Sequence, residues 1–350
     1  MIESSEALAE FVDAMRPVGR IGLDTEADSL HCYFEKLCLV QISIPGQDVL
    51  IDPLAGFPLE PLFAELPRHE IIIQGLDYDL RLLRRAGMTE VGGVFDTMIA
   101  ARLVGCTEFS LAALLLNHFG ITLAKGSQKA NWARRPLSPQ MIEYAGNDTR
   151  HLEELAVKLE DQLCQLGRME WFRQSCEKAI EATRIIRERE AETVWRISGS
   201  GLLRGRSAAL LRALWHWRDE EARSVDKPAF HILRNDLLIE SAQRFAEGRP
   251  VNVPHLSGGR ARRFFQAAEQ ALALTEGEWP QPIRNHRPRP TPAMEKRFDE
   301  FKVRRDHAAE HHRIDPSLIA SKSLLENLAQ DTDATLERIL PWQRMLLGLE

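Results

Sequence analysis

The first third of the chain predicts an α/β domain, because apolar runs of strand length alternate with helically spaced apolar positions. A helix capped by Ser4 or Ser5 extends to about Met15. The turn residues Pro45-Gly46 separate two strand-like runs, which predicts a hairpin. The expected strands are Arg20–Asp24, Leu37–Ile44, Asp48–Ile51, Ile71–Ile73 and a short one near Val91–Phe95. Antiparallel strands followed by strands that alternate with helices indicate one mixed sheet with helices on its faces.

The remainder of the chain predicts helices and carries no strand signal beyond about Asp148. The expected helical segments are Leu76–Leu83, Thr97–Val104, Ser110–Phe119, one from Ser138 onward, one long charged helix over about Thr149–Ile197, and the blocks Leu202–Thr275 and Met294–Leu347. The prolines of Trp279–Pro292 favour an extended spacer between the two blocks. We therefore expect an α/β domain with its connecting helix at residues 1–198, helical domains at 199–278 and 294–350, and a Pro/Arg-rich linker at 279–293.

Composition narrows the class of protein. The 350 residues are 44% hydrophobic and 27% charged, which is typical of a globular chain. The five cysteines are scattered and form no C-x-x-C pair, so neither a disulfide framework nor a structural zinc site is expected. Acids stand near the N-terminus where a signal peptide carries bases, and no apolar run reaches the ~18–20 residues of a membrane span. We expect a cytoplasmic protein without membrane contact.

The net charge of −6 argues at first against a nucleic-acid partner, because phosphate binding depends on Lys and Arg. The average conceals two net basic segments, Ile121–Arg150 and Gln281–Arg313. Local charge governs an encounter with an anionic polymer, so nucleic acid remains a candidate partner.

Three groups of acidic residues stand where side chains can converge. Asp24 and Glu26 are two residues apart at the end of the first predicted strand, so both point to the same face. Asp77 and Asp79 follow the Ile71–Ile73 strand at the start of a helix, where one of them could be only a cap. Tyr144 and Asp148 share one face of a later helix.

Each group alone is commonly structural, but together they have the composition of a two-metal site. Two Mg²⁺ ions ~3.5–4 Å apart activate a water and stabilise the leaving oxygen of a phosphodiester, and hard cations require several carboxylate oxygens. Four carboxylates balance two divalent ions, and without metal they repel one another.

These residues resemble the motifs of the DEDD-type 3′–5′ exonucleases, in the tyrosine subclass that includes ribonuclease D. The matching segments are Asp24-Thr-Glu26, Asp79-Leu80, Tyr144-Ala-Gly-Asn-Asp148 and the run from Lys125 through Gln128, Trp132 and Arg135-Pro-Leu to Gln140. The resemblance covers roughly Met1–Leu163. Gln74 and Ala130-Asn131 depart from the family pattern, which concerns substrate positioning because none of them is a metal ligand.

The helical blocks resemble HRDC domains, which are small nucleic-acid-binding modules. The first does so through Leu210–Arg218, Pro228–Leu233 and Leu237-Leu238, and the second through Phe298–Val303, the region of Ile319 and Trp342. The resemblance implies a ribonuclease-H-like mixed-sheet exonuclease domain followed by two all-α HRDC-type domains.

The resemblance also implies roles for individual residues. Asp24, Glu26 and Asp148 would hold the metal that activates water, and Asp24 would bridge to a second metal near Asp79. Tyr144 would orient the attacking water. Lys125, Gln128 and Arg135 would contact the 3′-terminal nucleotides.

The implied activity is a 3′–5′ exoribonuclease that uses two Mg²⁺ ions, with Mn²⁺ as a substitute, and releases nucleoside 5′-monophosphates. The implied substrates are precursors of tRNA and other stable RNAs, with no obligate protein partner. A DNA-directed exonuclease of the same chemistry and a non-catalytic RNA-binding protein on the same fold stay open as alternatives. The intact set of ligands counts against the second.

Two further patterns favour ordinary structural explanations. His307-Ala-Ala-Glu-His311 matches an H-x-x-E-H zinc motif, but it lies in a charged helical segment without a third ligand. Trp215 and Trp217 have the spacing of core residues more than of base-stacking residues.

Overall fold

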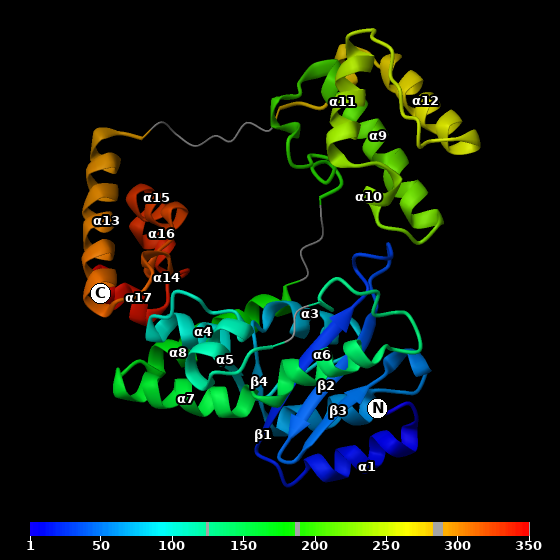
Figure 1. Cartoon of the computed structure of the whole chain (residues 1–350). Coiled ribbons are helices and arrows are strands. Elements are labelled where there is room, and N and C mark those ends of the chain that lie inside the picture. Colours follow the sequence, from blue (N-terminus) through cyan, green and yellow to red (C-terminus); the bar gives the residue numbers. More distant parts are fainter. Residues whose placement is uncertain (124–125, 186–189, 283–289, 350) are drawn as a thin grey trace. The chain divides into compact units, whose positions relative to one another are not determined.

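The computed structural model describes residues 1–123, 126–185, 190–282 and 290–349. The chain forms two compact units (Figure 1): Met1–Ala27 with Leu37–Ile185 and Pro288–Glu350, and Asp28–Lys36 with Ile186–Arg287. Lys125 and most of the basic part of the expected linker lie outside the described residues. No described helix is long and apolar enough to cross a membrane.

A five-stranded mixed sheet organises the first unit, as the sequence predicts. Its strands are β1 (Arg20–Ala27), β2 (Leu37–Ile44), β3 (Gln47–Ile51), β4 (Glu70–Ile73) and β5 (Val94–Asp96), in the order β3-β2-β1-β4-β5. The hairpin β2–β3 and the pair β1–β2 are antiparallel, whereas β4 runs parallel to both β1 and β5. Every strand of the described chain lies within residues 20–96, which confirms that the remainder is helical.

Side-chain caps fix where several helices begin. Ser110 and Ser138 accept hydrogen bonds from the third residue after each, and Asp96 accepts from the two amides Met98 and Ile99. The helices of this unit are α1 (Ser5–Met15), α2 (Glu60–Glu65), α3 (Asp77–Arg85), α4 (Thr97–Val104), α5 (Leu111–Phe119), α6 (Pro139–Arg150), α7 (Leu152–Gln165), α8 (Met169–Arg184), α13 (Pro292–His312), α14 (Pro316–Ile319), α15 (Lys322–Gln330), α16 (Thr332–Leu336) and α17 (Pro341–Leu347), with 3₁₀ turns at Pro53–Ala55 and Leu66–Arg68.

Alternation along β1 separates the two faces of the sheet. Ile21 and Leu23 belong to an apolar core with α1, α2 and α3. Gly22 faces the other side, where a Cβ atom at this position would stand 2.9 Å from the carbonyl oxygen of Thr149. The absence of a side chain therefore lets the end of α6 approach β1 closely.

The expectation of one long helix over Thr149–Ile197 is wrong. The chain instead forms the end of α6, then α7 and α8, with a turn at Gly167, whose φ is +67°. This left-handed conformation is open to glycine and interrupts the helix, so that α8 packs back against α7.

The C-terminal helices share one hydrophobic core with the helices beside the sheet. Trp171 of α8 stacks on Trp342 of α17 with ring centroids 5.0 Å apart. The guanidinium of Arg168 donates to the carbonyl oxygens of Leu103 and His312, at 2.5 and 2.6 Å. Residues 290–349 are thus packed as part of the first unit.

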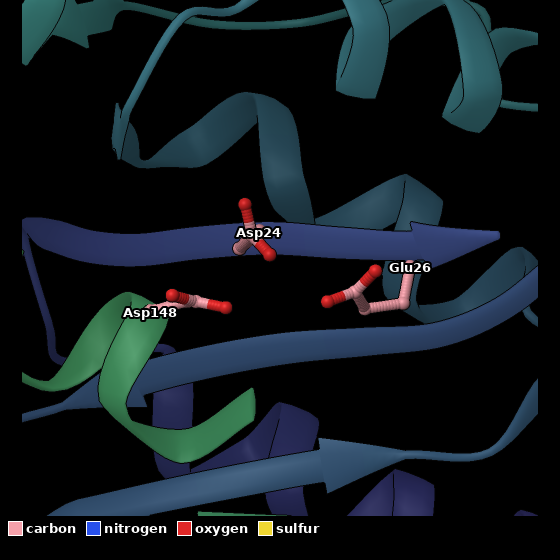
Figure 2. Close-up of side chains that lie close together, drawn as sticks. All are labelled: Asp24, Glu26 and Asp148. Carbon is pink, nitrogen blue, oxygen red and sulfur yellow. The ribbon is translucent and has the colours of Figure 1, made fainter. Parts of the chain in front are cut away.

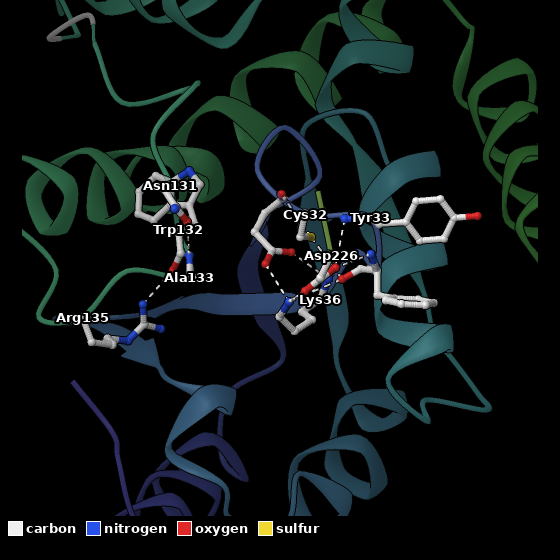
Figure 3. Close-up of polar contacts among 10 residues, drawn as sticks. Cys32, Tyr33, Lys36, Asn131, Trp132, Ala133, Arg135 and Asp226 are labelled. Atoms are coloured by element: carbon white, nitrogen blue, oxygen red, sulfur yellow. Dashed lines mark hydrogen bonds and ion pairs between the residues drawn. The ribbon is translucent and has the colours of Figure 1, made fainter. Parts of the chain in front are cut away.

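The second unit is helical and consists of α9 (Gly205–Ser224), α10 (Ala229–Ile232), α11 (Asn235–Ala246) and α12 (Gly258–Leu272), with 3₁₀ turns at Ser200–Leu202 and Glu276–Glu278. Trp217 is buried against Phe264, which confirms it as a core residue. Asp226 accepts hydrogen bonds from the amides of Tyr33 and Phe34, both at 3.0 Å, and so fixes the Asp28–Lys36 segment within this unit (Figure 3). The domain boundaries expected at residues 198, 278 and 293 stay predictions.

Candidate active site

Three carboxylates from two elements meet above one face of the sheet. Asp24 and Glu26 project from β1, and Asp148 projects from α6 (Figure 2). One oxygen atom of each lies within 4.8 Å of the others. Within the described part of the chain this is the one group of three or more acidic, His or Cys side chains close enough to share a metal ion.

Local structure explains why these three meet. Asp24 and Glu26 lie two residues apart on a strand and point to the same face. The close approach at Gly22 brings the end of α6 onto that face. The hydroxyl groups of Ser43 on β2 and of Thr149 are hydrogen-bonded at 2.7 Å, which holds the residue after Asp148 against the sheet.

Asp79 approaches the same region from α3. One of its carboxylate oxygens accepts from the backbone amide and the hydroxyl of Thr25, at 3.1 and 2.6 Å. Asp77 is instead exposed and paired with Arg81 at 3.0 Å. These positions support Asp79 rather than Asp77 as the acidic residue of this segment.

Asp96, at the end of β5, holds the turn before Asp79. Besides capping α4, its buried carboxylate accepts from the amides of Gly75 and Leu76, at 3.2 and 2.7 Å. Gln74 is fixed by the carbonyl oxygen of Phe109, which accepts from its amide at 2.8 Å. These contacts fix the start of α3 relative to β4.

Burial and mutual repulsion raise the pKa of all four carboxyl groups. Burial is the larger cause in each case; it raises the pKa of Glu26 to about 9, of Asp148 to about 7 and of Asp79 to about 6, and holds that of Asp24 well above its ordinary value. Repulsion from neighbouring carboxylates adds to each shift. A cation placed among these carboxyl groups would displace their protons into solvent and bind the carboxylates.

The side chains available fit a divalent metal ion. Carboxylate oxygens are the ligands that Mg²⁺ and Mn²⁺ prefer. Among the described residues no lysine or arginine forms an ion pair with Asp24, Glu26 or Asp148, so this half-buried acidic site lacks a positive charge. A bound cation would stabilise the charged form of such a cluster.

Tyr144 stands one helical turn before Asp148. Its hydroxyl lowers the pKa of Asp148 by hydrogen bonding, and its own pKa is raised, first by burial and then by the carboxylates around it. The group therefore stays a neutral phenol and a hydrogen-bond donor at ordinary pH. Gln128 also hydrogen-bonds with this hydroxyl, which places that residue at the site.

Arg135 is half-buried, and its guanidinium is fully engaged by hydrogen bonds. Its guanidinium donates to both carboxylate oxygens of Asp52, at 2.5 and 2.6 Å, and to the carbonyl oxygen of Cys38 at 2.8 Å. It also donates to the carbonyl oxygen of Trp132 at 2.7 Å (Figure 3). A further bond to the carbonyl of Arg134 engages the last of its five N–H groups. This favours a role in fixing the segment before α6; direct contact of Arg135 with a substrate stays a prediction, as does that of Lys125.

The sequence interpretation missed Thr25 and Asp96. An aspartate between a short strand and a helix is a usual N-cap signal, and this signal could have indicated one of the two roles of Asp96. No local pattern indicated that Thr25 bonds to a residue 54 positions away. His307 and Glu310 are exposed on α13, and the described residues include no metal-binding group there.

Comparison with known proteins agrees with this geometry. Residues 1–164 match the family described as 3′–5′ exonuclease, and residues 207–256 match the HRDC domain. Ribonuclease D of Gluconacetobacter diazotrophicus is 28% identical over 100% of this chain and 91% of its own.

Two solved structures share the fold over most of their length. A protein from Bifidobacterium adolescentis has a TM-score of 0.83 at 26% identity and covers 99% of this chain and 94% of its own. The crystal structure of Escherichia coli RNase D, described as an exoribonuclease involved in structured RNA processing, has a TM-score of 0.71 at 27% identity and covers 94% of this chain and 89% of its own. The likeness thus extends through both the α/β and the helical parts, and it identifies an enzyme. The chain is thus similar to ribonuclease D over nearly its whole length, and its residues 1–164 match the 3′–5′ exonuclease family.

Proposed function

We propose that this protein is a Mg²⁺-dependent 3′–5′ exoribonuclease that hydrolyses the terminal phosphodiester and releases nucleoside 5′-monophosphates. The observation that carries the proposal is the half-buried cluster of Asp24, Glu26 and Asp148, which has no cationic side chain to neutralise it among the described residues. Several carboxylate oxygens close together without a cationic partner are suited to hold divalent ions.

The carboxylates have separate tasks in this proposal. Asp24, Glu26 and Asp148 would hold one ion, and Asp24 together with Asp79 would hold the second; Mn²⁺ would be able to replace Mg²⁺. When bound, the two ions supply an activated water and neutralise the charge that develops on the leaving oxygen. Thr25 keeps the Asp79 carboxylate oriented through two hydrogen bonds.

Tyr144 orients the attacking water. Its raised pKa keeps the proton on the hydroxyl, so it acts as a donor and not as a general base. Gln128, which hydrogen-bonds with Tyr144, contacts the terminal nucleotide together with Lys125, and Arg135 keeps their segment in place through Asp52.

We propose RNA, in particular the 3′ ends of tRNA precursors, as the substrate. Support comes from the relatives named ribonuclease D and from the HRDC match, which indicates nucleic-acid binding by the second unit. Discrimination against DNA would depend on contacts with the 2′-hydroxyl group.

Digestion of matched RNA and DNA oligomers, labelled at the 3′ or the 5′ end, tests the proposal. With Mg²⁺ we expect the 3′ label to appear at once as a mononucleotide while the 5′-labelled strand shortens stepwise. Asp24→Asn should abolish both signals, and Asp77→Asn, which changes an exposed carboxylate of α3, should not. Faster digestion of DNA would favour the DNA-directed alternative, and binding without digestion would favour a non-catalytic protein.

A further inference from the structure

A buried amide without a hydrogen-bond partner lies beside the acidic cluster. Gln41 of β2 is fully buried, and neither its amide nitrogen nor its amide oxygen has a hydrogen-bond partner within the described part of the chain. Buried polar groups are nearly always hydrogen-bonded, because leaving them unpaired costs stability that folding otherwise retains. An unpaired buried group beside a candidate active site suggests that its hydrogen-bond partner is present only when the site has bound its ligand or metal.

The register of the sheet places this amide next to Asp24. Gln41 and Asp24 are directly opposite each other in the antiparallel pair β1–β2. Side chains of opposed residues project to the same face of an antiparallel sheet, with Cβ atoms ~4.5–5.5 Å apart. Gln41 therefore lies on the face that carries the acidic cluster.

The other side chains beside Gln41 on this face offer it no free polar group. Leu50 is opposite Gln41 on β3, and Leu39 is two residues before it on β2; both are buried in an apolar cluster with Ala145 of α6. Ser43, two residues after it, hydrogen-bonds to Asp48 and Thr149, both at 2.7 Å.

We propose that Gln41 is a positioning residue for the metal site: its amide nitrogen donates a hydrogen bond to the Asp24 carboxylate when metal is bound. A carboxylate shared by two cations needs a fixed orientation, and a neutral N–H donor supplies it without adding charge to an acidic site. The proposal rests on the proposed function, because it assigns the amide to the metal-loaded state. It also explains why a fully buried polar side chain is retained on a strand whose neighbouring positions on this face are apolar or already paired.

Gln41→Met tests this role, because methionine has nearly the shape of glutamine and no N–H donor. The probe is Mn²⁺ alone, titrated calorimetrically into the full chain. We expect the dissociation constant to rise at least about tenfold, the effect of losing one hydrogen bond to a charged group. In RNA digestion kcat should fall while KM stays near the wild-type value, because the residue acts on the metal and does not contact the RNA.

Thermal unfolding without metal gives the decisive second readout. A merely structural residue loses stability when its polar atoms are removed, whereas an amide without a partner should leave Tm unchanged or higher after Gln41→Met. Ile42→Val is the matched control, since Ile42 is buried on the opposite face of the same strand; it should lower Tm slightly and leave Mn²⁺ affinity unchanged.

Gln41→Glu keeps the shape but replaces the donor by another acceptor. It should lower Tm without metal, through repulsion with Asp24, and should not improve Mn²⁺ binding. Tighter binding would mean that position 41 acts as a direct ligand, and it would overturn the donor role. Wild-type Mn²⁺ affinity in Gln41→Met, or a fall in its metal-free Tm, would also overturn the proposal.

Wild type and Asp24→Asn are measured in the same series to separate the two proposals. If wild type binds no Mn²⁺ and digests no RNA, the proposed function fails. If wild type binds Mn²⁺, Asp24→Asn does not, and Gln41→Met behaves as wild type, only the inference about Gln41 fails.

Discussion

Thr25 donates two hydrogen bonds to one oxygen of Asp79, from its backbone amide at 3.1 Å and from its hydroxyl at 2.6 Å. The strand that presents Asp24 and Glu26 on one face thus holds the fourth acidic residue through the residue between them. This contact couples two motifs that are 54 residues apart.

We expect Thr25→Val to reduce kcat about 10- to 100-fold, because it removes a hydrogen bond to a charged group worth about 1.5–3 kcal/mol. The backbone hydrogen bond remains, so the protein should fold. Thr25→Ser keeps the hydroxyl and should retain most of the activity. Single-turnover digestion of a short RNA measures both, and equal activity of the valine variant and wild type would show that Asp79 needs no orientation by this hydroxyl.

Asp79→Ala should abolish hydrolysis, whereas Asp77→Ala should keep most of it. Asp79 is buried and hydrogen-bonded to Thr25 of β1. Asp77 is exposed and forms an ion pair with Arg81 one turn later on the same helix. Comparable losses in the two variants would assign Asp77 a part in fixing the start of the helix. The measurement is the rate of mononucleotide release at saturating Mg²⁺.

Asp148→Asn should abolish activity and stabilise the metal-free protein. The folded-state pKa of Asp148, about 7, lies above its unfolded value, so the protonated form favours folding at low pH and this contribution is lost as pH rises through about 7. The asparagine variant is uncharged at every pH, so its stability does not decrease in this way. The difference in Tm between variant and wild type should therefore increase from pH 5 to pH 8 in the presence of a chelator.

Saturating Mg²⁺ should remove that difference, because bound cations favour the charged carboxylates of the wild type. A Tm difference that is constant across this range would mean that Asp148 titrates normally in the folded protein.

Trp342→Ala should destabilise the whole first unit by about 3–5 kcal/mol, the usual cost of removing a large buried aromatic side chain. Trp342 stacks on Trp171 and donates to the hydroxyl of Ser175, so its loss opens the core that the C-terminal helices share with α8. Urea unfolding of wild type and variant, followed by the activity, measures this. Unchanged stability would show that residues 290–349 are a separate module.

The same packing changes what a truncation can test. Removing everything after about residue 198 would expose Trp171 of α8, which is buried and packs against His312 and Trp342 of the C-terminal helices. Lost RNA binding in such a fragment would then report on folding as well as on the helical modules. Charge substitutions in the second unit, measured across a salt series, separate the two effects.

The sequence by itself determined the mixed sheet, its hairpin and the residue types of the acidic site. Period-two apolar runs and the turn residues between them were enough to predict the hairpin of β2 and β3. The spacing of the motifs was enough to predict that Asp24, Glu26 and Asp148 act together. These are local properties: side-chain alternation along one strand and one helix face follows from backbone geometry alone. The break of the expected long helix at Gly167 shows their limit, because periodicity alone did not reveal where that helix ends.

Only the tertiary structure decided which partners these residues have. The hydrogen bonds from Thr25 to Asp79 and from Arg135 to Asp52 join segments that no local pattern relates. The position of Gln41 opposite Asp24, with an amide that has no partner among the described residues, likewise follows only from the pairing of two strands. The stacking of Trp342 on Trp171, which makes the C-terminal helices part of the first unit, belongs with them. Such contacts depend on how faces of different elements pack together, and the free energy of that packing is a property of the assembled core and not of any one segment.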